Sequence, residues 1–261
     1  MTAQKYRVPS YKKHEYQPKQ TQYCVGVPVL NEGRRFLTQL TKMKKQAAKA
    51  DIIIFDGGSD DGSTEHNILK ENNINTLLVK TGPGGLSAQL RMGFDFALKR
   101  GYSGIITVDG NNKDNVEAIP DFIKALAEGQ DFIQGSRYLP GGRAVNTPLH
   151  RTLAIKLIHV PVISLVAGFK YTDTTNGFRG YSRKFLTDPE VNPFRDIFDS
   201  YELLGYLSVK APELNYRVKE IPVTRRYPAR GQTPTKISHF KGNLQLMKIL
   251  VDLCLHRYDV D

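Results

Sequence analysis

Two aspartates stand where runs of apolar residues end. Asp56 follows the run at 51–55, "DIIIF", and Asp109 follows the run at 104–108, "GIITV". Each aspartate opens a segment rich in glycine and oxygen-bearing side chains, "DGGSDDGS" and "DGNNKD". A carboxylate in such a segment can accept hydrogen bonds from a nucleobase or a ribose, and it can hold a hard divalent cation beside a diphosphate. The two segments therefore predict a site for a phosphorylated, nucleotide-like ligand.

Three other apolar runs also lead into polar turn segments. "NEG" follows the run at 23–30, "TGPGG" follows 76–80, and "GSRYLPGG" begins where 131–135 ends. Amphipathic helices are predicted between these runs, at 32–49, 86–100 and 115–127. Apolar strands that alternate with helices predict an α/β fold, an open and mostly parallel twisted sheet with helices on both faces. In such sheets the ligand lies beyond the carboxyl ends of the strands, so the polar segments should share one edge.

The basic residues point to an anionic partner. The net charge of +11 fits nucleic acid, phosphorylated metabolites or an acidic membrane surface. Arg137, Arg179, Arg230 and Lys236 lie in loops rich in glycine or proline, where their side chains can bind phosphate oxygens. We expect these four residues to contact phosphates.

Residues 1–20 are basic and lack apolar periodicity, which predicts a flexible arm before a single domain at 21–261. The apolar segment at 149–169 contains several basic residues and a proline, so it is not expected to span a bilayer. A helix of this composition can lie on a membrane, and the alternative is an ordinary surface helix. No secretory leader is recognised and Cys24 and Cys254 are expected to be reduced, so the expected location is the cytoplasm, with contact to the cytoplasmic face of a membrane.

The polar segments together resemble the motifs of family 2 glycosyltransferases with the GT-A fold, in the dolichyl-phosphate mannose synthase-like branch. The similar segments are "PVLNE" at 28–32, "DGGSDDGS" at 56–63, "GGLSAQLRMGFDFA" at 84–97, "GSRYLPGG" at 135–142 and "DTTNGFRGYSR" at 173–183. Each motif is short, and their common order and spacing carry the resemblance.

The resemblance implies an inverting sugar transferase for cell-envelope or glycoconjugate synthesis. Its donor would be a UDP- or GDP-sugar, and its acceptor a lipid phosphate, such as a polyprenyl phosphate, or a glycan. The nucleotide-sugar half would span about 21–140 and the acceptor half about 141–261. The residues expected to bind the nucleotide sugar are Pro28, Asn31, Glu32, Asp56, Gly58, Ser59, Gly85, Asp109 and Gly110.

A divalent cation, Mg²⁺ or Mn²⁺, is a further implication of the resemblance. Asp109 matches the first carboxylate of the family's Asp-x-Asp motif, but the second position is Asn111. The predicted ligands are therefore Asp109 and Asn111, with either a substitute ligand in Asp114 or weak metal binding. Such a cation would neutralise the charge that develops on a departing diphosphate.

The identity of the acceptor decides whether a base is needed. A lipid phosphate is already anionic, so Arg137 and Arg179 would only position it and screen its charge. A sugar hydroxyl must lose a proton, and the candidate bases are Asp173 and Glu202.

Three other functions stay open at this stage. The exchange at Asn111 would suit a non-catalytic protein that senses nucleotide sugars. A sugar-phosphate nucleotidyltransferase would need a glycine-rich loop where the sequence has "VPVLNEG". A basic nucleic-acid-binding module is the third, but the chain has no recognisable helix-turn-helix, zinc-finger or RNA-recognition signature, so nucleic acid is not the expected partner. The oligomeric state stays open, with a homodimer as one option.

Overall fold

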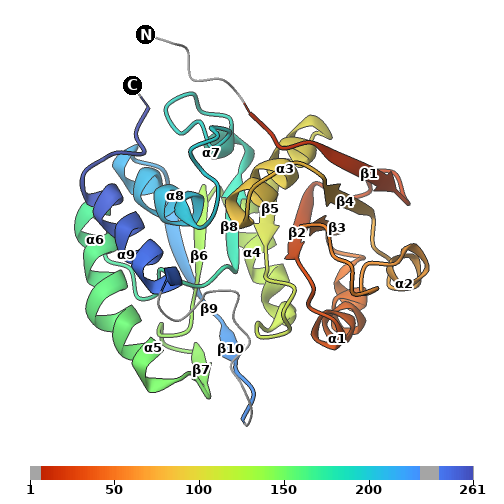
Figure 1. The fold of residues 1–261 in the computed structure, drawn as a ribbon, viewed down its shortest axis with the longest axis horizontal. Coiled ribbons are helices and arrows are strands. Elements are labelled where there is room, and N and C mark those ends of the chain that lie inside the picture. The colour runs from red at the N-terminus through yellow and green to blue at the C-terminus, as the bar shows by residue number, and fades with distance from the viewer. Residues whose placement is uncertain (1–6, 230–240, 261) are drawn as a thin grey trace.

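The computed structural model describes residues 7–229 and 241–260, so Arg230 and Lys236 lie outside the described residues. A mixed eight-stranded sheet forms the centre of the molecule, in the order β1-β4-β3-β2-β5-β8-β6-β9 (Figure 1). Its strands are β1 (Tyr11–Glu15), β2 (Tyr23–Val29), β3 (Asp51–Asp56), β4 (Thr76–Lys80), β5 (Gly104–Thr107), β6 (Phe132–Ser136), β8 (Arg179–Ser182) and β9 (Val218–Pro222). A second, two-stranded sheet pairs β7 (Arg143–Val145) with β10 (Thr224–Arg226).

The helices lie between these strands. They are α1 (Arg34–Met43), α2 (His66–Glu71), α3 (Leu86–Lys99), α4 (Ile119–Ala127), α5 (Leu149–Ala154), α6 (Val160–Ala167), α7 (Arg183–Leu186), α8 (Glu202–Glu213) and α9 (Lys241–Cys254). Short 3₁₀ turns η1 (Lys44–Gln46) and η2 (Val116–Ala118) follow α1 and precede α4, and a π-helical turn η3 (Ile155–His159) joins α5 to α6.

The direction of the strands brings several strand ends to one edge. Strands β4, β3, β2 and β5 are mutually parallel. Strand β8 is antiparallel to both of its neighbours, β5 and β6, so β6 runs in the same direction as β5. The carboxyl ends of β2, β3, β5 and β6 therefore lie along one edge of the sheet, which is the arrangement that the sequence predicted.

The two faces of the sheet carry separate apolar cores because side chains alternate along a strand. On β3, Ile52 and Ile54 pack in a cluster with residues of α1, α2 and α4. The intervening Ile53 and Phe55 pack with α3, α6, α8 and α9 on the other face. This arrangement confirms the predicted α/β sheet with helices on both faces.

The N-terminal segment differs from the expected flexible arm. Residues 11–15 form β1, which pairs antiparallel with β4 at the edge of the sheet. The segment continues to bond the domain beyond this strand, since the Tyr16 amide donates to the Asn75 carbonyl at 2.9 Å. The expectation of an unpacked arm is therefore wrong for residues 11–15. The boundaries of a single domain at 21–261 stay a prediction.

Two features of the C-terminal half complete the fold. The segment at 214–226 divides into β9, which pairs with β6, and β10, which pairs with β7. Cys254 is exposed at the end of α9, whereas Cys24 is buried.

One phenyl ring fixes the distance between the sheet and α3. A Cβ atom added to Gly26 on β2 would lie 2.2 Å from the Phe55 ring, and one added to Gly93 on α3 would lie 2.1 Å from the same ring. Both glycines therefore serve close packing around Phe55, which is fully buried.

We expect Gly93→Ala to lower the free energy of unfolding. Overpacking of this rigid ring costs about 1–3 kcal/mol, which exceeds the gain of up to about 1 kcal/mol in helix propensity. The measurement is urea denaturation followed by circular dichroism. Gly205→Ala on α8 is the matched control, because its new Cβ would approach closely only the flexible end of the Leu253 side chain, at 2.7 Å, and would lie 4.0 Å from an Ile249 methyl. Equal losses in the two variants would contradict this account of Phe55.

Candidate functional site

Two strand-end loops, after β2 and β3, are joined by hydrogen bonds. The Asn31 amide donates to Ser59 Oγ at 3.0 Å, and Asn31 Oδ1 accepts from the Asp60 amide at 2.9 Å. The Gly33 amide donates to Asp61 Oδ2 at 2.8 Å. Asn31 adopts a positive φ of 48°, a conformation that asparagine tolerates better than most residues. The two predicted nucleoside-binding loops therefore form one polar surface.

Asp56 lies beneath this surface and stabilises the loop after β3. Its side chain is buried, and Oδ1 accepts from the Gly58 and Ser59 amides at 3.2 and 2.9 Å and from Ser59 Oγ at 2.6 Å. Thr64 Oγ1 donates to the second oxygen at 3.4 Å. The Asp56 carboxylate, predicted to contact the nucleoside, thus stabilises the glycine-rich turn by hydrogen bonds. The exposed groups of that turn are the ones that a ligand could contact.

The other predicted nucleotide-binding residues lie around this surface. Glu32 is held by Arg35, whose Nε and Nη2 lie 3.0 and 2.8 Å from Glu32 Oε2. The Gly110 amide donates to the Pro28 carbonyl at 3.1 Å, which joins the ends of β5 and β2. Gly85 precedes α3, and its amide donates to the Asp199 carbonyl at 3.0 Å. Pro28 also lines a narrow hollow beside Asp109.

Arg225 bridges two carboxylates at the edge of the sheet. Its Nη2 lies 2.9 Å from Asp109 Oδ2, and its Nη1 donates to Asp114 Oδ2. Burial would raise the pKa of Asp109, but the adjacent Arg225 charge outweighs burial and holds this pKa below its ordinary value. Burial raises the pKa of the fully buried Asp114. The sequence motifs do not single out Arg225, whose signal in the sequence is its place among the basic residues at 217–226.

The segment at 173–177 organises the same edge. Thr175 Oγ1 accepts from Arg137 Nη2 at 2.6 Å, and Asn176 Oδ1 accepts from Arg225 Nη1 at 3.3 Å. Gly177 packs against Asp109, because a Cβ at that position would lie 2.5 Å from Asp109 Oδ1. This short segment therefore places both guanidinium groups relative to the Asp109 carboxylate.

Arg137 and Asp173 form a buried, doubly hydrogen-bonded ion pair. Arg137 Nε lies 2.7 Å from Asp173 Oδ2, and Nη2 lies 2.9 Å from Oδ1. Burial would raise the pKa of Asp173, but the hydrogen bonds and charge of Arg137 hold it below its ordinary value. The pair raises the pKa of Arg137 despite burial. Asp173 thus stays ionised and committed to Arg137, which makes it a weak proton acceptor.

Two other predicted catalytic residues form hydrogen bonds with backbone groups. Arg179 is buried and donates to three backbone carbonyls, those of Thr174, Asn176 and Leu204. Glu202 Oε2 accepts from the amides of Asp199 and Ser200 at 3.1 and 2.6 Å. That loop in turn caps α3, since the Asp199 carbonyl accepts from the Gly85 and Ala88 amides. This geometry gives both side chains a positioning role.

The residues beside Asp109 suit a divalent cation held partly by its substrate. The Asp109 side chain is 25% exposed, and Asn111 Nδ2 lies 3.3 Å from its Oδ2. Mg²⁺ commonly binds through one or two carboxylates together with substrate phosphates, so one partly exposed carboxylate and one amide oxygen fit this mode. Asp114 Oδ1 and Asn176 Nδ2 are buried with no hydrogen-bond partner among the described residues, so polar groups at this edge remain to be satisfied.

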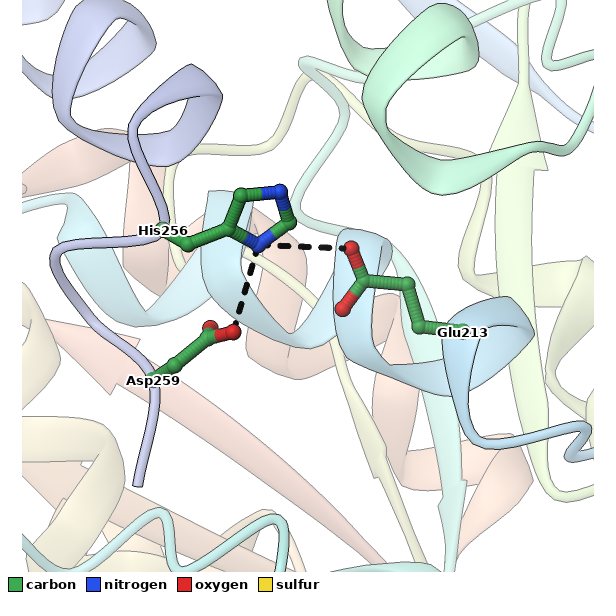
Figure 2. A group of neighbouring side chains, drawn as sticks. All are labelled: Glu213, His256 and Asp259. Carbon is green, nitrogen blue, oxygen red and sulfur yellow. Dashed lines mark hydrogen bonds and ion pairs between the residues drawn. The ribbon is translucent and has the colours of Figure 1, made fainter. Parts of the chain in front are cut away.

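A separate group of potential metal ligands lies near the end of the chain. Glu213, His256 and Asp259 point toward one another, with His256 Nδ1 3.8 Å from Glu213 and 3.2 Å from Asp259 (Figure 2). The Lys210 ammonium lies 3.1 Å from Glu213 Oε2 and 2.9 Å from Asp259 Oδ2. Lys210 already neutralises the carboxylates of Glu213 and Asp259. We therefore interpret this group as an ion-pair network that links the segment after α9 to α8.

Comparisons with known proteins give the family of a chain with this fold and this polar edge. Residues 24–188 match the model of glycosyl transferase family 2. The chain belongs to this family and is a glycosyltransferase. This result confirms the resemblance that the motifs carried.

Two curated relatives cover most of the chain. Polyprenol monophosphomannose synthase of Mycolicibacterium smegmatis is 26% identical over 77% of this chain and 76% of its own length. Undecaprenyl-phosphate mannosyltransferase of Micrococcus luteus is 25% identical over 76% of this chain and 81% of its own length.

The fold is also shared with a solved structure. Glucosyl-3-phosphoglycerate synthase of Mycobacterium tuberculosis, in complex with Mn²⁺, UDP and phosphoglyceric acid, superposes with a TM-score of 0.63 at 15% identity. The match covers 89% of this chain and 78% of the other. It shows that the fold is GT-A, and another crystal structure of that synthase contains Mg²⁺ and UDP.

Substitution of Arg225 should destabilise the protein strongly. Arg225→Met leaves two carboxylates at this edge without their counter-charge, and loss of one partner of a buried ion pair costs about 3–5 kcal/mol. The measurement is the free energy of unfolding in urea. Arg226→Met is the matched control at the exposed neighbouring position and should change stability little. In the double variant Arg225→Met/Asp114→Asn, the loss of unfolding free energy should be smaller than in Arg225→Met alone. An equal loss in both variants would contradict the bridge of Arg225 between the two carboxylates.

The Arg137–Asp173 pair predicts a pH-dependent loss of stability. The pKa of Asp173 is lower in the folded state than its unfolded value of about 3.9, so the pair stabilises fully above that value. This contribution is lost as pH falls through the folded pKa. Asp173→Asn should therefore be less stable than the parent at about pH 6, and the difference should shrink toward about pH 2. Denaturation at several pH values measures this, with exposed Asp121→Asn as control.

Proposed function

We propose that this chain transfers a sugar from a nucleotide diphosphate sugar to a polyprenyl phosphate, with inversion at the anomeric carbon. The two curated relatives are named as a polyprenol monophosphomannose synthase and an undecaprenyl-phosphate mannosyltransferase, which supports such an acceptor. The joined loops after β2 and β3 would bind the nucleoside, and the edge around Asp109 would bind the diphosphate. The donor is a UDP- or GDP-sugar.

The observation that carries this proposal is that neither predicted base is free. Asp173 is paired with Arg137, and Glu202 accepts two backbone hydrogen bonds. A hydroxyl acceptor would need a carboxylate to take its proton, whereas a phosphate acceptor is already ionised. A site with two guanidinium groups and two committed bases therefore favours the phosphate.

The reaction is a single displacement. An oxygen of the acceptor phosphate forms a bond to the anomeric carbon, and the bond from that carbon to the diphosphate breaks. The nucleoside diphosphate leaves with the bonding electrons, and no proton is transferred. When a divalent cation is bound, it neutralises charge on the diphosphate, and Asp109 and Asn111 would hold it.

The described residues supply position and charge for this step. Arg225 keeps Asp109 ionised and oriented, and Gly177 leaves room for the carboxylate at the strand end. Arg137, fixed by Asp173 and Thr175, places a second positive charge on the same segment. Preorganised charges of this kind act without reorganisation during the reaction. Arg230 and Lys236 remain proposed phosphate ligands that lie outside the described residues.

A transfer assay tests the proposal. Purified protein is incubated with radiolabelled UDP- or GDP-sugars, Mg²⁺ or Mn²⁺, and a short-chain prenyl phosphate. Asp109→Ala should reduce transfer by at least about a thousandfold. The protein then lacks the carboxylate that is proposed to hold the cation beside the diphosphate. Glu202→Gln, which keeps one oxygen as a hydrogen-bond acceptor, should retain transfer.

The matching prenyl alcohol separates the two acceptor classes. Transfer to the alcohol at a rate equal to that for the phosphate would contradict the absence of a base. A product with the anomeric configuration of the donor would contradict the single displacement.

A further inference from the structure

Glu220 is a half-buried carboxylate on β9 that lies behind the Arg137–Asp173 pair. Strand β9 pairs with β6, and the register places Glu220 opposite Gln134, two residues before Ser136. Glu220 Oε1 accepts from the amides of Thr172 and Asp173 at 3.0 and 3.1 Å. Its Oε2 accepts from the amide and from Oγ1 of Thr172, both at 2.9 Å. Three donors of the segment at 172–173 therefore converge on this one carboxylate.

Two hydroxyl groups extend the network from Glu220 to the turn that contains Arg137. Thr172 Oγ1 lies 2.5 Å from Ser136 Oγ. Ser136 Oγ in turn accepts from the amides of Tyr138 and Leu139, both at 3.1 Å. A continuous chain of hydrogen bonds therefore links β9 to the turn at 136–139.

The charge of Glu220 sets the direction of every proton in this chain. An ionised carboxylate only accepts hydrogen bonds, so Thr172 donates its hydroxyl proton to Glu220 and Ser136 donates its own to Thr172. Both lone pairs of Ser136 Oγ are then free for the two amides. A protonated Glu220 would reverse the order and leave the Ser136 proton without an acceptor among the described residues. Burial raises the pKa of Glu220, and the donors of Thr172 and Asp173 oppose this by favouring the ionised form.

Both members of the Arg137–Asp173 pair are held by this network. The Asp173 amide donates directly to Glu220, and the peptide group after Arg137 is fixed by Ser136 Oγ. The Arg137 amide also donates to Asp173 Oδ2 at 3.2 Å. Glu220 therefore sets the backbone geometry of the pair without a contact to the guanidinium group.

The orientation of Arg137 decides which of its nitrogens can meet a phosphate. Arg137 Nε and Nη2 are used by Asp173 and Thr175. Within the described part of the chain, Nη1 is thus the guanidinium nitrogen that remains for a phosphate oxygen. Because a guanidinium group binds phosphate through a rigid, planar set of donors, a rotation of Arg137 would weaken that contact.

We propose that Glu220 is a positioning residue that orients Arg137 toward the acceptor phosphate. It acts through the hydroxyls of Thr172 and Ser136 and through the Asp173 amide. Both oxygens of Glu220 are used by protein donors, so the residue itself does not contact the substrate. The inference rests on the proposed function, since it assigns Arg137 to the phosphate of the acceptor.

The near-isosteric variant Glu220→Gln tests the positioning role. Both positions that the new amide nitrogen can take face a backbone N–H of the protein, so at least one hydrogen bond is lost. The KM for a short-chain prenyl phosphate should rise about tenfold, which corresponds to the loss of about one hydrogen bond. The kcat and the KM for the sugar donor should stay within about twofold of the parent, because Arg137 is expected to contribute binding of the acceptor.

Lys219→Gln is the matched control on the same strand. Lys219 is exposed and lies 3.7 Å from Glu128, outside the network of Glu220. Its variant should have the kinetic constants of the parent. An acceptor KM that is equal in Glu220→Gln and in the parent would overturn the proposal. A lowered melting temperature and kcat with an unchanged acceptor KM would assign Glu220 a purely structural role and would also overturn it.

Two substitutions of Thr172 test the hydroxyl chain. Thr172→Val keeps the size of the side chain but removes the link between Glu220 and Ser136, so the acceptor KM should rise as in Glu220→Gln. Thr172→Ser keeps the hydroxyl and should stay close to the parent. A parent-like acceptor KM in Thr172→Val would contradict transmission through the hydroxyls.

Amide hydrogen exchange separates this proposal from the proposed function, because it needs no acceptor. The amides of Tyr138 and Leu139 should exchange faster in Glu220→Gln than in the parent or in Lys219→Gln. Faster exchange in a protein that transfers no sugar to the prenyl phosphate would contradict the proposed function and leave the positioning of the Arg137 turn intact. Unchanged exchange in Glu220→Gln would overturn the positioning role, even in a protein that performs the transfer.

Discussion

The candidate site depends on one charge arrangement, the Arg225 guanidinium between Asp109 and Asp114. A buried carboxylate is costly without a counter-charge, and here two carboxylates converge at the end of β5. Arg225 comes from β10, more than a hundred residues later in the chain. This charge arrangement at the candidate site therefore forms only when the C-terminal half is folded against it. One ion-paired residue therefore links the two halves of the chain at the candidate site.

The antiparallel strand β8 makes this coupling possible. It lies between β5 and β6, and the segment just before it contacts Arg137, Arg225 and Asp109 in turn. A short rigid segment thus fixes two positive charges beside one carboxylate. The two expected bases are used within this framework, Asp173 for Arg137 and Glu202 for the loop that caps α3. In the proposed reaction such a site would hold anions by fixed charges, because both expected bases already have partners.

The sequence by itself determined the α/β sheet, the edge that carries the site and the family. Buried parallel strands read as continuous apolar runs, so "DIIIF" and "GIITV" predicted β3 and β5, and the positions of Asp56 and Asp109 followed from where these runs end. Only the tertiary structure decided which partner each charged side chain takes. Arg225 with Asp109, Arg137 with Asp173 and β1 with β4 are pairings between residues far apart in the chain. Periodicity reports which side of an element is buried, but it carries no information about the distant group that a side chain will meet.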